Sequence, residues 1–218
     1  MELGSLSACI ILAGGTANRL HGVSKPDYQV AGRRLLDILA DEIDRAGGVD
    51  TCIVVAPQHV RIPDHAQRAL EDPPFGGPLA GIGAGIAALT ATSGDALVAL
   101  CTCDAPLSPR NWSQLVASLS GSERRTSASL DDHDRGFSVE GVAGAVPVTV
   151  SADGSRSRFH YLHGVYTLAA LRSLNFARNG SVRSAFADLP VEKFADTSDN
   201  CIDVDTDDDA QRLALRVD

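Results

Sequence analysis

The segment Ala8-Cys9-Ile10-Ile11-Leu12-Ala13-Gly14-Gly15-Thr16-Ala17-Asn18-Arg19, followed by Lys25-Pro26, decides the fold of this chain. An apolar run ends abruptly at paired glycines, and two cations come after them. This pattern predicts a buried strand that turns sharply at its carboxyl end, because glycine permits positive φ and close approach of a ligand to the main chain. Arginine and lysine supply the countercharge that a polyphosphate needs. We therefore expect a nucleotide site at the start of an α/β domain.

Length and composition indicate an ordinary globular chain. The 218 residues are 44% hydrophobic and 22% charged, with a net charge of -9, which fits one large domain and argues against a nucleic-acid or anionic-membrane surface. A few local cations can still hold an anionic nucleotide. The apolar runs are much shorter than the roughly 18 residues that span a bilayer, and Glu2 stands where a secretory leader would be basic. We expect a cytoplasmic protein, monomeric or homo-oligomeric, with no membrane or nucleic-acid partner.

Cysteines and histidines show no clear ligand pattern. The five cysteines have no disulfide-framework spacing, which predicts reduced thiols. Cys101 and Cys103 form a C-x-C pair without a second ligand pair, so we interpret them as small buried side chains at a strand end. The six histidines form no H-x-x-x-H motif, and we expect them mostly at the surface. No G-x-S-x-G motif or evident nucleophile triad is present.

Hydrophobic patterning predicts alternating strands and helices in the first part of the chain. The order is the signature of a parallel sheet with right-handed crossovers. The helix at 79–92 is rich in glycine, which lowers helix propensity, so we expect a close packing partner or a ligand near its start. Strands are expected at 8–12, 51–56 and 96–101, and helices at 35–46, 60–70, 79–92 and 109–119.

The second part of the chain is less regular. Residues 120–141 are polar and predict an exposed loop, centred on 131–136. Residues 142–150 and 161–167 predict strands, with a hairpin turn at Asp153-Gly154. Thr206 is the expected N-cap of a closing helix at 206–215, because three aspartates follow it in the first turn. Short helices are expected at 168–175 and 182–189, and a strand at 191–194.

Two loops at predicted strand ends carry candidate site residues. Gly14 and Gly15, with Arg19 and Lys25, could wrap a triphosphate, although their spacing matches neither the P-loop nor the dinucleotide fingerprint. A tight turn with solvated cations is the alternative. Asp104 follows the third strand, where ligands bind in open α/β sheets. Its carboxylate could hold Mg²⁺ against substrate phosphates, or could cap the helix that follows.

Two further segments could complete the site. Gly76-Gly77-Pro78-Leu79-Ala80-Gly81 brings bare backbone to a helix start, which can receive a purine edge, or can simply be a loop that needs such turns. Glu71 or Asp72, just upstream, could accept hydrogen bonds from guanine, or could be an ordinary exposed acid. Asp203-Val204-Asp205-Thr206 precedes the last helix, and one of its carboxylates could join Asp104 at a metal, whereas capping explains Thr206 without any function.

With these segments identified, the chain resembles the molybdenum cofactor guanylyltransferase family of NTP transferases over most of its length. Residues 12–19 with Lys25 are similar to the family's L-A-G-G-x-S-x-R-M-G-x-D-K motif. Residues 77–81 match G-P-L-A-G, and Cys103-Asp104-Ala105-Pro106 is similar to C-D-M-P. Residues 203–209 are similar to N-x-N-T-P-E-D-L. Related cytidylyltransferases have L-A-A-G and lack G-P-L-A-G, so the resemblance favours guanine.

The resemblance implies a Rossmann-like three-layer fold with a mostly parallel sheet, and Mg²⁺-dependent transfer of GMP from GTP to molybdopterin. It assigns 1–120 to the nucleotide and 121–218 to the acceptor, within one domain. Catalytic roles are implied for Arg19, Lys25 and Asp104, metal binding for Asp104 and Asp205, and acceptor contacts for Asp203 and Asp205. Nucleotide contacts are implied for Leu12, Ala13, Gly14, Gly15, Lys25, Asp72, Gly77, Pro78, Leu79, Ala80 and Gly81.

The chain also departs from the family pattern. One extra residue lies between Arg19 and Lys25, and Ser24 stands where the family has Asp. Asp203 and Asp205 replace two asparagines that lie near the pterin in the family, and residues 162–165 lack an expected proline. Two alternatives therefore stay open. One is transfer to another phosphorylated acceptor, such as a sugar phosphate, and the other is a nucleotide-binding protein without catalysis.

Overall fold

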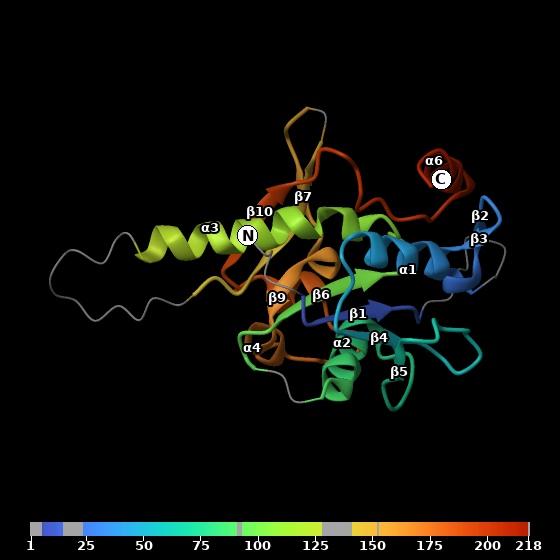
Figure 1. Ribbon diagram of the computed structural model, residues 1–218, viewed down its shortest axis with the longest axis horizontal. Helices are drawn as coiled ribbons and strands as arrows, with labels where there is room; N and C mark the ends of the chain where they lie inside the picture. Colours follow the sequence, from blue (N-terminus) through green and yellow to red (C-terminus); the bar gives the residue numbers. More distant parts are fainter. Residues whose placement is uncertain (1–5, 15–23, 91–92, 128–140, 152, 218) are drawn as a thin grey trace, which may run out of the picture.

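A mostly parallel sheet of eight strands lies at the centre of the described chain (Figure 1). The computed structural model describes residues 6–14, 24–90, 93–127, 141–151 and 153–217. The strand order is β10-β7-β9-β6-β1-β4-β5, with β8 paired to β7. The strands are β1 (Ala8–Leu12), β4 (Thr51–Val55), β5 (Gln67–Ala69), β6 (Leu97–Thr102), β7 (Gly144–Val150), β8 (Ser157–Phe159), β9 (Val165–Thr167) and β10 (Val191–Ala195).

Strand β1 is central because its side chains are apolar on both faces of the sheet. Ile10 and Ile11 are fully buried, and β1 pairs in parallel with β4 on one side and β6 on the other. Leu12 lies opposite Thr102, the last residue of β6. Carboxyl ends of adjacent parallel strands meet at one edge of a sheet. The loops that carry Gly14 and Asp104 are therefore neighbours.

Helices cover both faces of the sheet, which confirms the three-layer α/β prediction. Figure 1 shows α1 and α3 on one side of the sheet and α2 and α4 on the other. A core with Leu36 and Trp112 fills the first interface, and a core with Ile82 and Leu168 fills the second. The helices are α1 (Leu35–Arg45), α2 (Gly77–Ala88), α3 (Trp112–Ser127), α4 (Leu168–Arg172), α5 (Val182–Phe186) and α6 (Asp207–Ala214).

The glycines of α2 permit the close packing that the sequence indicates. A Cβ atom on Gly85 would lie 2.5 Å from Cγ2 of Ile10, and one on Gly81 would lie 3.1 Å from Cδ2 of Leu12. The 2.5 Å contact requires glycine at position 85, because Ile10 is held in the core and cannot move away. The helix thus approaches β1 closely and places its first turn at the carboxyl edge of the sheet.

Several predicted elements differ from the structure. The predicted helix at 60–70 is wrong: this segment contains β5, which pairs with β4, and Pro63 precedes it. Arg68 donates to the carbonyls of Pro57 and Val60 at 2.5 and 2.6 Å, which holds the segment extended. The hairpin at Asp153-Gly154 is confirmed, but its return strand is β8 rather than 161–167. Residues 161–167 instead contain a 3-10 turn, η3 (Tyr161–His163), and the short strand β9.

The helix after β6 also differs from the prediction in its bounds. It begins at Trp112, after a 3-10 turn η2 (Ser108–Asn111), and its backbone continues to Ser127, into the segment predicted as a loop. The expected loop centre at 131–136 lies outside the described residues. The predicted helix at 35–46 is confirmed as α1. The predicted capping of α6 is also confirmed, because Thr206 and Asp209 form a capping box.

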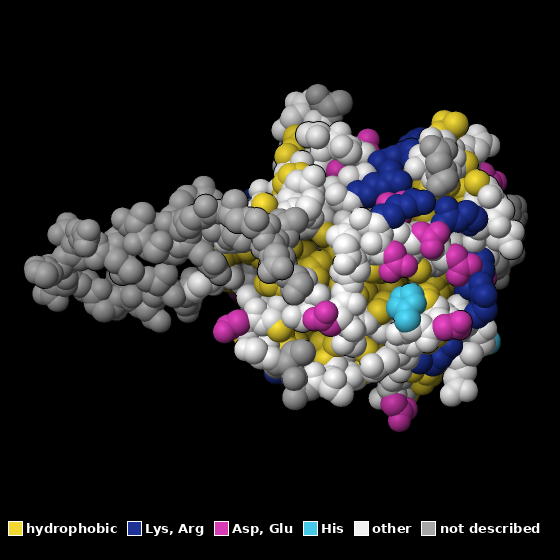
Figure 2. Space-filling model, in the orientation of Figure 1, with side chains coloured by type: hydrophobic (Ala, Val, Ile, Leu, Met, Phe, Trp, Pro, Cys, Tyr) yellow, Lys and Arg dark blue, Asp and Glu magenta, His cyan; other side chains and the backbone are white. Residues whose placement is uncertain are grey.

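A small hairpin and ion pairs stabilise the region next to α1. Strands β2 (Gln29–Val30) and β3 (Arg33–Arg34) follow another 3-10 turn, η1 (Lys25–Asp27). Arg34 pairs with Asp27 at 2.7 Å and with Asp37 at 3.1 Å, and this links η1 to α1. Figure 2, which has the orientation of Figure 1, shows basic and acidic side chains beside one another on the surface around α1. Among the described residues, no helix has the length and apolar character needed to cross a membrane.

Candidate active site

Two cavities meet at the carboxyl edge of β1 and β6. The smaller has a volume of about 380 Å³ and the larger about 740 Å³. Thr102, Asp104 and Leu162 line both cavities. The backbone N–H of Val204 donates to the carbonyl oxygen of Asp104 at 2.7 Å, which fixes the segment before α6 beside the loop after β6. Asp104 thus borders the two cavities.

The smaller cavity brings together most of the residues that the sequence assigned to a nucleotide. Leu79 and Ala13 are instead buried in the core, and Ala80 does not line the cavity. Gly15 and Arg19 lie outside the described residues. The lining includes Leu12, Gly14, Lys25, Gly77, Pro78, Gly81 and Asp104.

Glu71, rather than Asp72, lies at this cavity. Asp72 is exposed and does not line it, whereas Glu71 does. The backbone N–H of Gly76 donates to Oε1 of Glu71 at 3.2 Å, so the carboxylate is held near the start of α2. Gly77 has φ +81°, a conformation that favours glycine. The two acids could not be distinguished from the sequence because they are adjacent.

Two residues that sequence reasoning missed also line the smaller cavity. Phe75 is 72% exposed and has a φ of +64°, an uncommon conformation for a bulky residue. Phe75 stands directly before the paired glycines Gly76-Gly77, and this position could have indicated a place at the cavity. Asn179 donates from its backbone N–H to the carbonyl of Gly76 at 2.6 Å. Nothing in the sequence around Asn179 indicates this contact, because the two residues are distant along the chain.

Lys25 connects three of the four segments that carry candidate site residues. Its ammonium donates to Oδ2 of Asp104 at 2.9 Å and to Oδ1 of Asp205 at 2.6 Å. Burial by itself would lower the pKa of Lys25, but the charges and hydrogen bonds of the two carboxylates raise it. Burial would likewise raise the pKa of Asp104, but Lys25, together with Thr102 and His163, lowers it. The lysine is therefore charged and Asp104 is a carboxylate at neutral pH.

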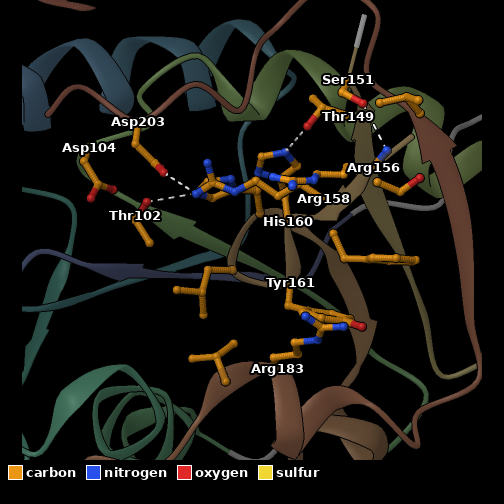
Figure 3. Close-up of a pocket in the computed structure, with 16 residues that line it drawn as sticks. Thr102, Asp104, Thr149, Ser151, Arg156, Arg158, His160, Tyr161, Arg183 and Asp203 are labelled. Carbon is orange, nitrogen blue, oxygen red and sulfur yellow. Dashed lines mark hydrogen bonds and ion pairs between the residues drawn. The ribbon is translucent and has the colours of Figure 1, made fainter. Parts of the chain in front are cut away.

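The larger cavity is lined by cationic and aromatic side chains (Figure 3). Arg158 donates to Oδ2 of Asp203 at 2.7 Å. The rings of Phe159 and Tyr161 stack with centroids 5.7 Å apart. Arg156, Arg158 and Arg183 all line this cavity, and three guanidinium groups favour an anionic occupant. Burial, followed by the charge of Asp104, raises the pKa of Asp203, and Arg158 opposes this shift.

The prediction of surface histidines is wrong for His160 and His163. They are 7% and 4% exposed, and both line the larger cavity. His160 shares a hydrogen bond with the hydroxyl of Thr149 at 3.0 Å, and His163 shares one with Thr102 at 2.9 Å. Burial is the main reason that the pKa of each ring falls to about 4. Both imidazoles are therefore neutral at pH 7. Among the described histidines, His59 and His65 are exposed as expected.

Asp104, His163 and Asp203 could hold a divalent cation. One ligand atom from each of the three lies within 4.8 Å of the others. Oδ1 of Asp104 is buried without a hydrogen-bond partner among the described residues, and a coordinated ion would satisfy such an atom. The residues present therefore fit a divalent ion. Asp205, the expected second ligand, contacts Lys25 instead, and Asp203 takes its place in this group.

Cys101 in β6 and Cys103 directly after it are buried, as the sequence suggested. Cys101 and Cys103 are free thiols with almost no exposure. Burial is the main cause that raises the pKa of each thiol. Neither belongs to a possible metal-binding group within the described ranges. Their role here is to fill the core beneath the site.

The fold and the two joined cavities define a Rossmann-like nucleotidyltransferase. The chain belongs to the MobA-like NTP transferase domain family, whose model matches residues 9–170. This result confirms the resemblance that the sequence motifs indicated. Members of the family bind an NTP and a phosphorylated acceptor, and NTP transferases generally use a divalent metal. No curated protein matches the chain by sequence.

Solved structures of similar fold cover nearly the whole chain. Rv0371c from Mycobacterium tuberculosis H37Rv is 18% identical, with a TM-score of 0.63 over 95% of this chain and 97% of that chain. The 2-C-methyl-D-erythritol 4-phosphate cytidylyltransferase from Thermus thermophilus is 16% identical, with a TM-score of 0.63 over 96% and 98%. Molybdopterin-guanine dinucleotide biosynthesis protein A from Archaeoglobus fulgidus is 13% identical, with a TM-score of 0.55 over 96% and 97%. These likenesses confirm the fold.

Proposed function

We propose that this chain transfers GMP from GTP to a phosphorylated acceptor, with Mg²⁺ as the divalent ion and molybdopterin as the first acceptor to test. One observation carries the proposal: Asp104 borders both a cavity that suits a nucleotide and a cavity lined by arginines. Two substrates that occupy these cavities would meet at Asp104. This arrangement supports a reaction between a nucleotide and an anionic acceptor.

The choice of guanine rests on the loop before α2. Gly77 and Gly81 leave bare backbone at the cavity, and Glu71 stands beside them. A carboxylate has several lone pairs, so Glu71 can accept from Gly76 and still accept from the N1–H and exocyclic amine of guanine. Adenine and cytosine do not present this pair of adjacent donors. Glu71 therefore replaces Asp72 as the proposed guanine-reading acid.

The choice of acceptor rests on the larger cavity. Arg156, Arg158 and Arg183 can bind phosphate oxygens by charge-assisted hydrogen bonds. Phe159 and Tyr161 stack on each other and line the cavity, which gives it an apolar side that suits the body of an organic acceptor such as a pterin. Most of this cavity comes from the second half of the chain. The lining therefore supports the proposed division into a nucleotide half at 1–120 and an acceptor half at 121–218.

In the proposed reaction, an oxygen of the acceptor's terminal phosphate attacks the α-phosphorus of GTP. The bond from the α-phosphorus to the bridging oxygen breaks, and pyrophosphate leaves with the electron pair. The attacking phosphate is already ionised at neutral pH, so no general base is needed. Catalysis then consists of positioning and electrostatic stabilisation. A divalent ion held by Asp104 would supply positive charge to phosphate oxygens.

Lys25 and Arg19 are the proposed cations for the leaving pyrophosphate. The Lys25 ammonium carries three N–H donors, of which two contact Asp104 and Asp205. The third can reach a phosphate oxygen in the same cavity. Asp104 keeps Lys25 oriented and charged, while the arginines of the second cavity hold the acceptor. These contacts would place both substrates before any bond changes.

A different phosphorylated acceptor, such as a sugar phosphate, is the second candidate. Asp203 lines the acceptor cavity and occupies a position where the family has asparagine. An anionic side chain disfavours a close acceptor phosphate unless a cation lies between them. Arg158, which contacts Asp203, could be that cation. A panel of acceptors distinguishes the two candidates.

Nucleotide choice can be tested by thermal shift with GTP, ATP, CTP and UTP in the presence of Mg²⁺. A ligand that binds only the native state raises stability by mass action. GTP should give the largest shift, and Glu71→Gln should reduce the GTP shift toward that of ATP. Asp72→Asn is the matched control because Asp72 is exposed and outside the cavity. A larger shift with CTP would contradict the guanine assignment.

Acceptor choice can be tested by pyrophosphate release with GTP and each acceptor. Molybdopterin should support turnover, and Asp104→Asn should reduce it at least about a hundredfold, as loss of a key electrostatic group does. Asp44→Asn, on the exposed face of α1, is the control that should keep full activity. Turnover with a sugar phosphate alone would favour the second candidate. GTP binding without turnover on any acceptor would contradict the proposed catalysis.

A further inference from the structure

His163 lies where the acceptor cavity reaches Asp104. It ends the 3-10 turn η3, which follows β8 and precedes β9. The residue is 4% exposed, and it lines the larger cavity together with Asp104 and Asp203. Figure 3 shows Asp203, Asp104 and Thr102 together on one side of this cavity. The nucleotide reaction described above assigns no task to His163.

Two buried atoms in this group lack a hydrogen-bond partner. Within the described part of the chain, Oδ1 of Asp104 and Nδ1 of His163 are the atoms concerned. The other ring nitrogen of His163, Nε2, lies 2.9 Å from the Thr102 hydroxyl. A buried polar atom without a partner costs about 1–3 kcal/mol, so two in one small cluster need an explanation. A cation that enters from the cavity would satisfy at least the carboxylate.

Ligand spacing in the group suits a small ion. One atom each from Asp104, His163 and Asp203 lies within 4.8 Å of the others. Ligands on opposite sides of a six-coordinate ion with bonds of about 2.1 Å are roughly 4 Å apart, so small side-chain rotations would close the shell. All three residues line the cavity, which provides an entry path for the ion. The remaining positions would be open to phosphate oxygens or water.

We infer that His163 is a third protein ligand, with Asp104 and Asp203, and that it gives this site a preference for Mn²⁺ or Co²⁺ over Mg²⁺. Imidazole suits transition metals, whereas Mg²⁺ prefers oxygen ligands. The inference deepens the proposed function: Mg²⁺ remains the ion proposed for the reaction, and His163 makes Mn²⁺ or Co²⁺ bind the same site more tightly. It rests on the placement of His163, not on the identity of the nucleotide or the acceptor.

A competing group shares the same histidine. His160, His163 and Cys201 also have ligand atoms within 4.8 Å of one another, and all three are buried. Cys201 does not line the cavity, and its sulfur accepts from the side-chain amide of Asn111 at 3.5 Å. His160 and His163 face the cavity, so an ion in this group would gain its third ligand, Cys201, only by leaving the cavity for the core. The cluster with Asp104 and Asp203 is therefore the better metal site. Substitution of His160 distinguishes the two clusters, because His160 belongs only to the other one.

Metal binding without nucleotide tests the inference. Equilibrium dialysis of the full chain at pH 7 would measure Co²⁺ and Mg²⁺ affinity separately, and the visible spectrum of bound Co²⁺ would report its ligands. His163→Gln should weaken Co²⁺ at least about tenfold and change Mg²⁺ by less than about threefold. His163→Asn is a second variant that removes the imidazole, and its urea midpoint shows whether it is folded. His160→Gln and the exposed His59→Gln should both keep the Co²⁺ spectrum.

Two results would overturn the inference. In one, His163→Gln keeps the wild-type ratio of Co²⁺ to Mg²⁺ affinity. In the other, His160→Gln also loses Co²⁺, and a thiolate charge-transfer band shows that Cys201 binds the ion. Neither measurement uses GTP or an acceptor. Failure of GMP transfer would therefore leave the metal result intact, and loss of the metal preference would leave the proposed transfer to be judged by its own assay.

Discussion

Replacement of Lys25 by methionine removes the charge that joins the Lys25, Asp104 and Asp205 segments while it keeps most of the side-chain volume. The ammonium is 2.9 Å from Asp104 and 2.6 Å from Asp205. Only 16% of the lysine side chain is exposed, against 25% for Asp104 and 46% for Asp205. The substitution therefore leaves one largely buried carboxylate and one half-exposed carboxylate without their shared cation.

The two contacts contribute unequally to the free energy of unfolding. A hydrogen bond to a charged group contributes about 1.5–3 kcal/mol when buried, which applies to Asp104. An exposed ion pair contributes about 0–1 kcal/mol, which applies to Asp205 because water replaces the lost partner. We therefore expect Lys25→Met to lower the free energy of unfolding by about 2–3 kcal/mol at pH 7. Arg61→Met is the control and should cost less than about 0.5 kcal/mol, because Arg61 is 76% exposed.

The loss of unfolding free energy in Lys25→Met should be larger at neutral pH than in acid. Lys25 lowers the pKa of Asp104 against the effect of burial, so its stabilisation is present above the ordinary pKa of 3.8 and is lost as pH falls through the native-state pKa. In Lys25→Met, burial dominates and the pKa of Asp104 rises. The stability difference between wild type and variant should therefore be widest near neutral pH and should narrow in acid.

Urea denaturation of four proteins would measure the interaction directly. The set is wild type, Lys25→Met, Asp104→Asn and the double variant, each followed by circular dichroism. A double-mutant cycle should give a coupling energy of at least about 1 kcal/mol. Additive effects within about 0.3 kcal/mol would refute the reasoning, because they would mean that the observed 2.9 Å contact does not stabilise the free protein.

Three other predictions follow from single side chains. Phe75→Ala should weaken GTP binding about fivefold in calorimetry, because an exposed aromatic at the cavity can stack on the base; unchanged affinity would exclude stacking. Arg183→Gln should raise the KM for the acceptor about tenfold and leave the KM for GTP unchanged, since Arg183 lines only the acceptor cavity. Glu42→Gln should cost about 2 kcal/mol at pH 7, because Arg110 contacts that buried carboxylate at 2.7 and 2.9 Å. The Arg110 hydrogen bonds lower the pKa of Glu42 despite its burial, so this cost should vanish in urea titrations as pH falls through that pKa.

Local pattern was enough to predict the carboxyl edge of the sheet. The apolar run before Gly14 and the one before Asp104 both end in turns, and parallel strands place such turns together. The sequence alone therefore puts Lys25 near Asp104, and the structure has their atoms 2.9 Å apart. The G-P-L-A-G segment was likewise placed at a helix start next to the same edge.

Side chains that depend on tertiary packing could not be predicted in the same way. His160 and His163 carry no spacing motif, and their burial results from a turn whose return strand, β8, was not anticipated. The choices between Asp203 and Asp205, and between Glu71 and Asp72, depend on where neighbouring side chains point. Pro63 weakened the predicted helix at 60–70, but only pairing with β4 makes part of it a strand. Each miss reflects a long-range contact that outweighs local preference.

Transfer of label from α-phosphorus-labelled GTP tests the central claim most directly. The wild-type chain, with a divalent ion and a phosphorylated acceptor, should place the label in an acceptor–GMP product and release one unlabelled pyrophosphate for each product formed. Asp104→Asn should form almost none, and CTP should be a poor donor. Label that remains entirely in GTP with every acceptor, or equal transfer by Asp104→Asn, would contradict the account.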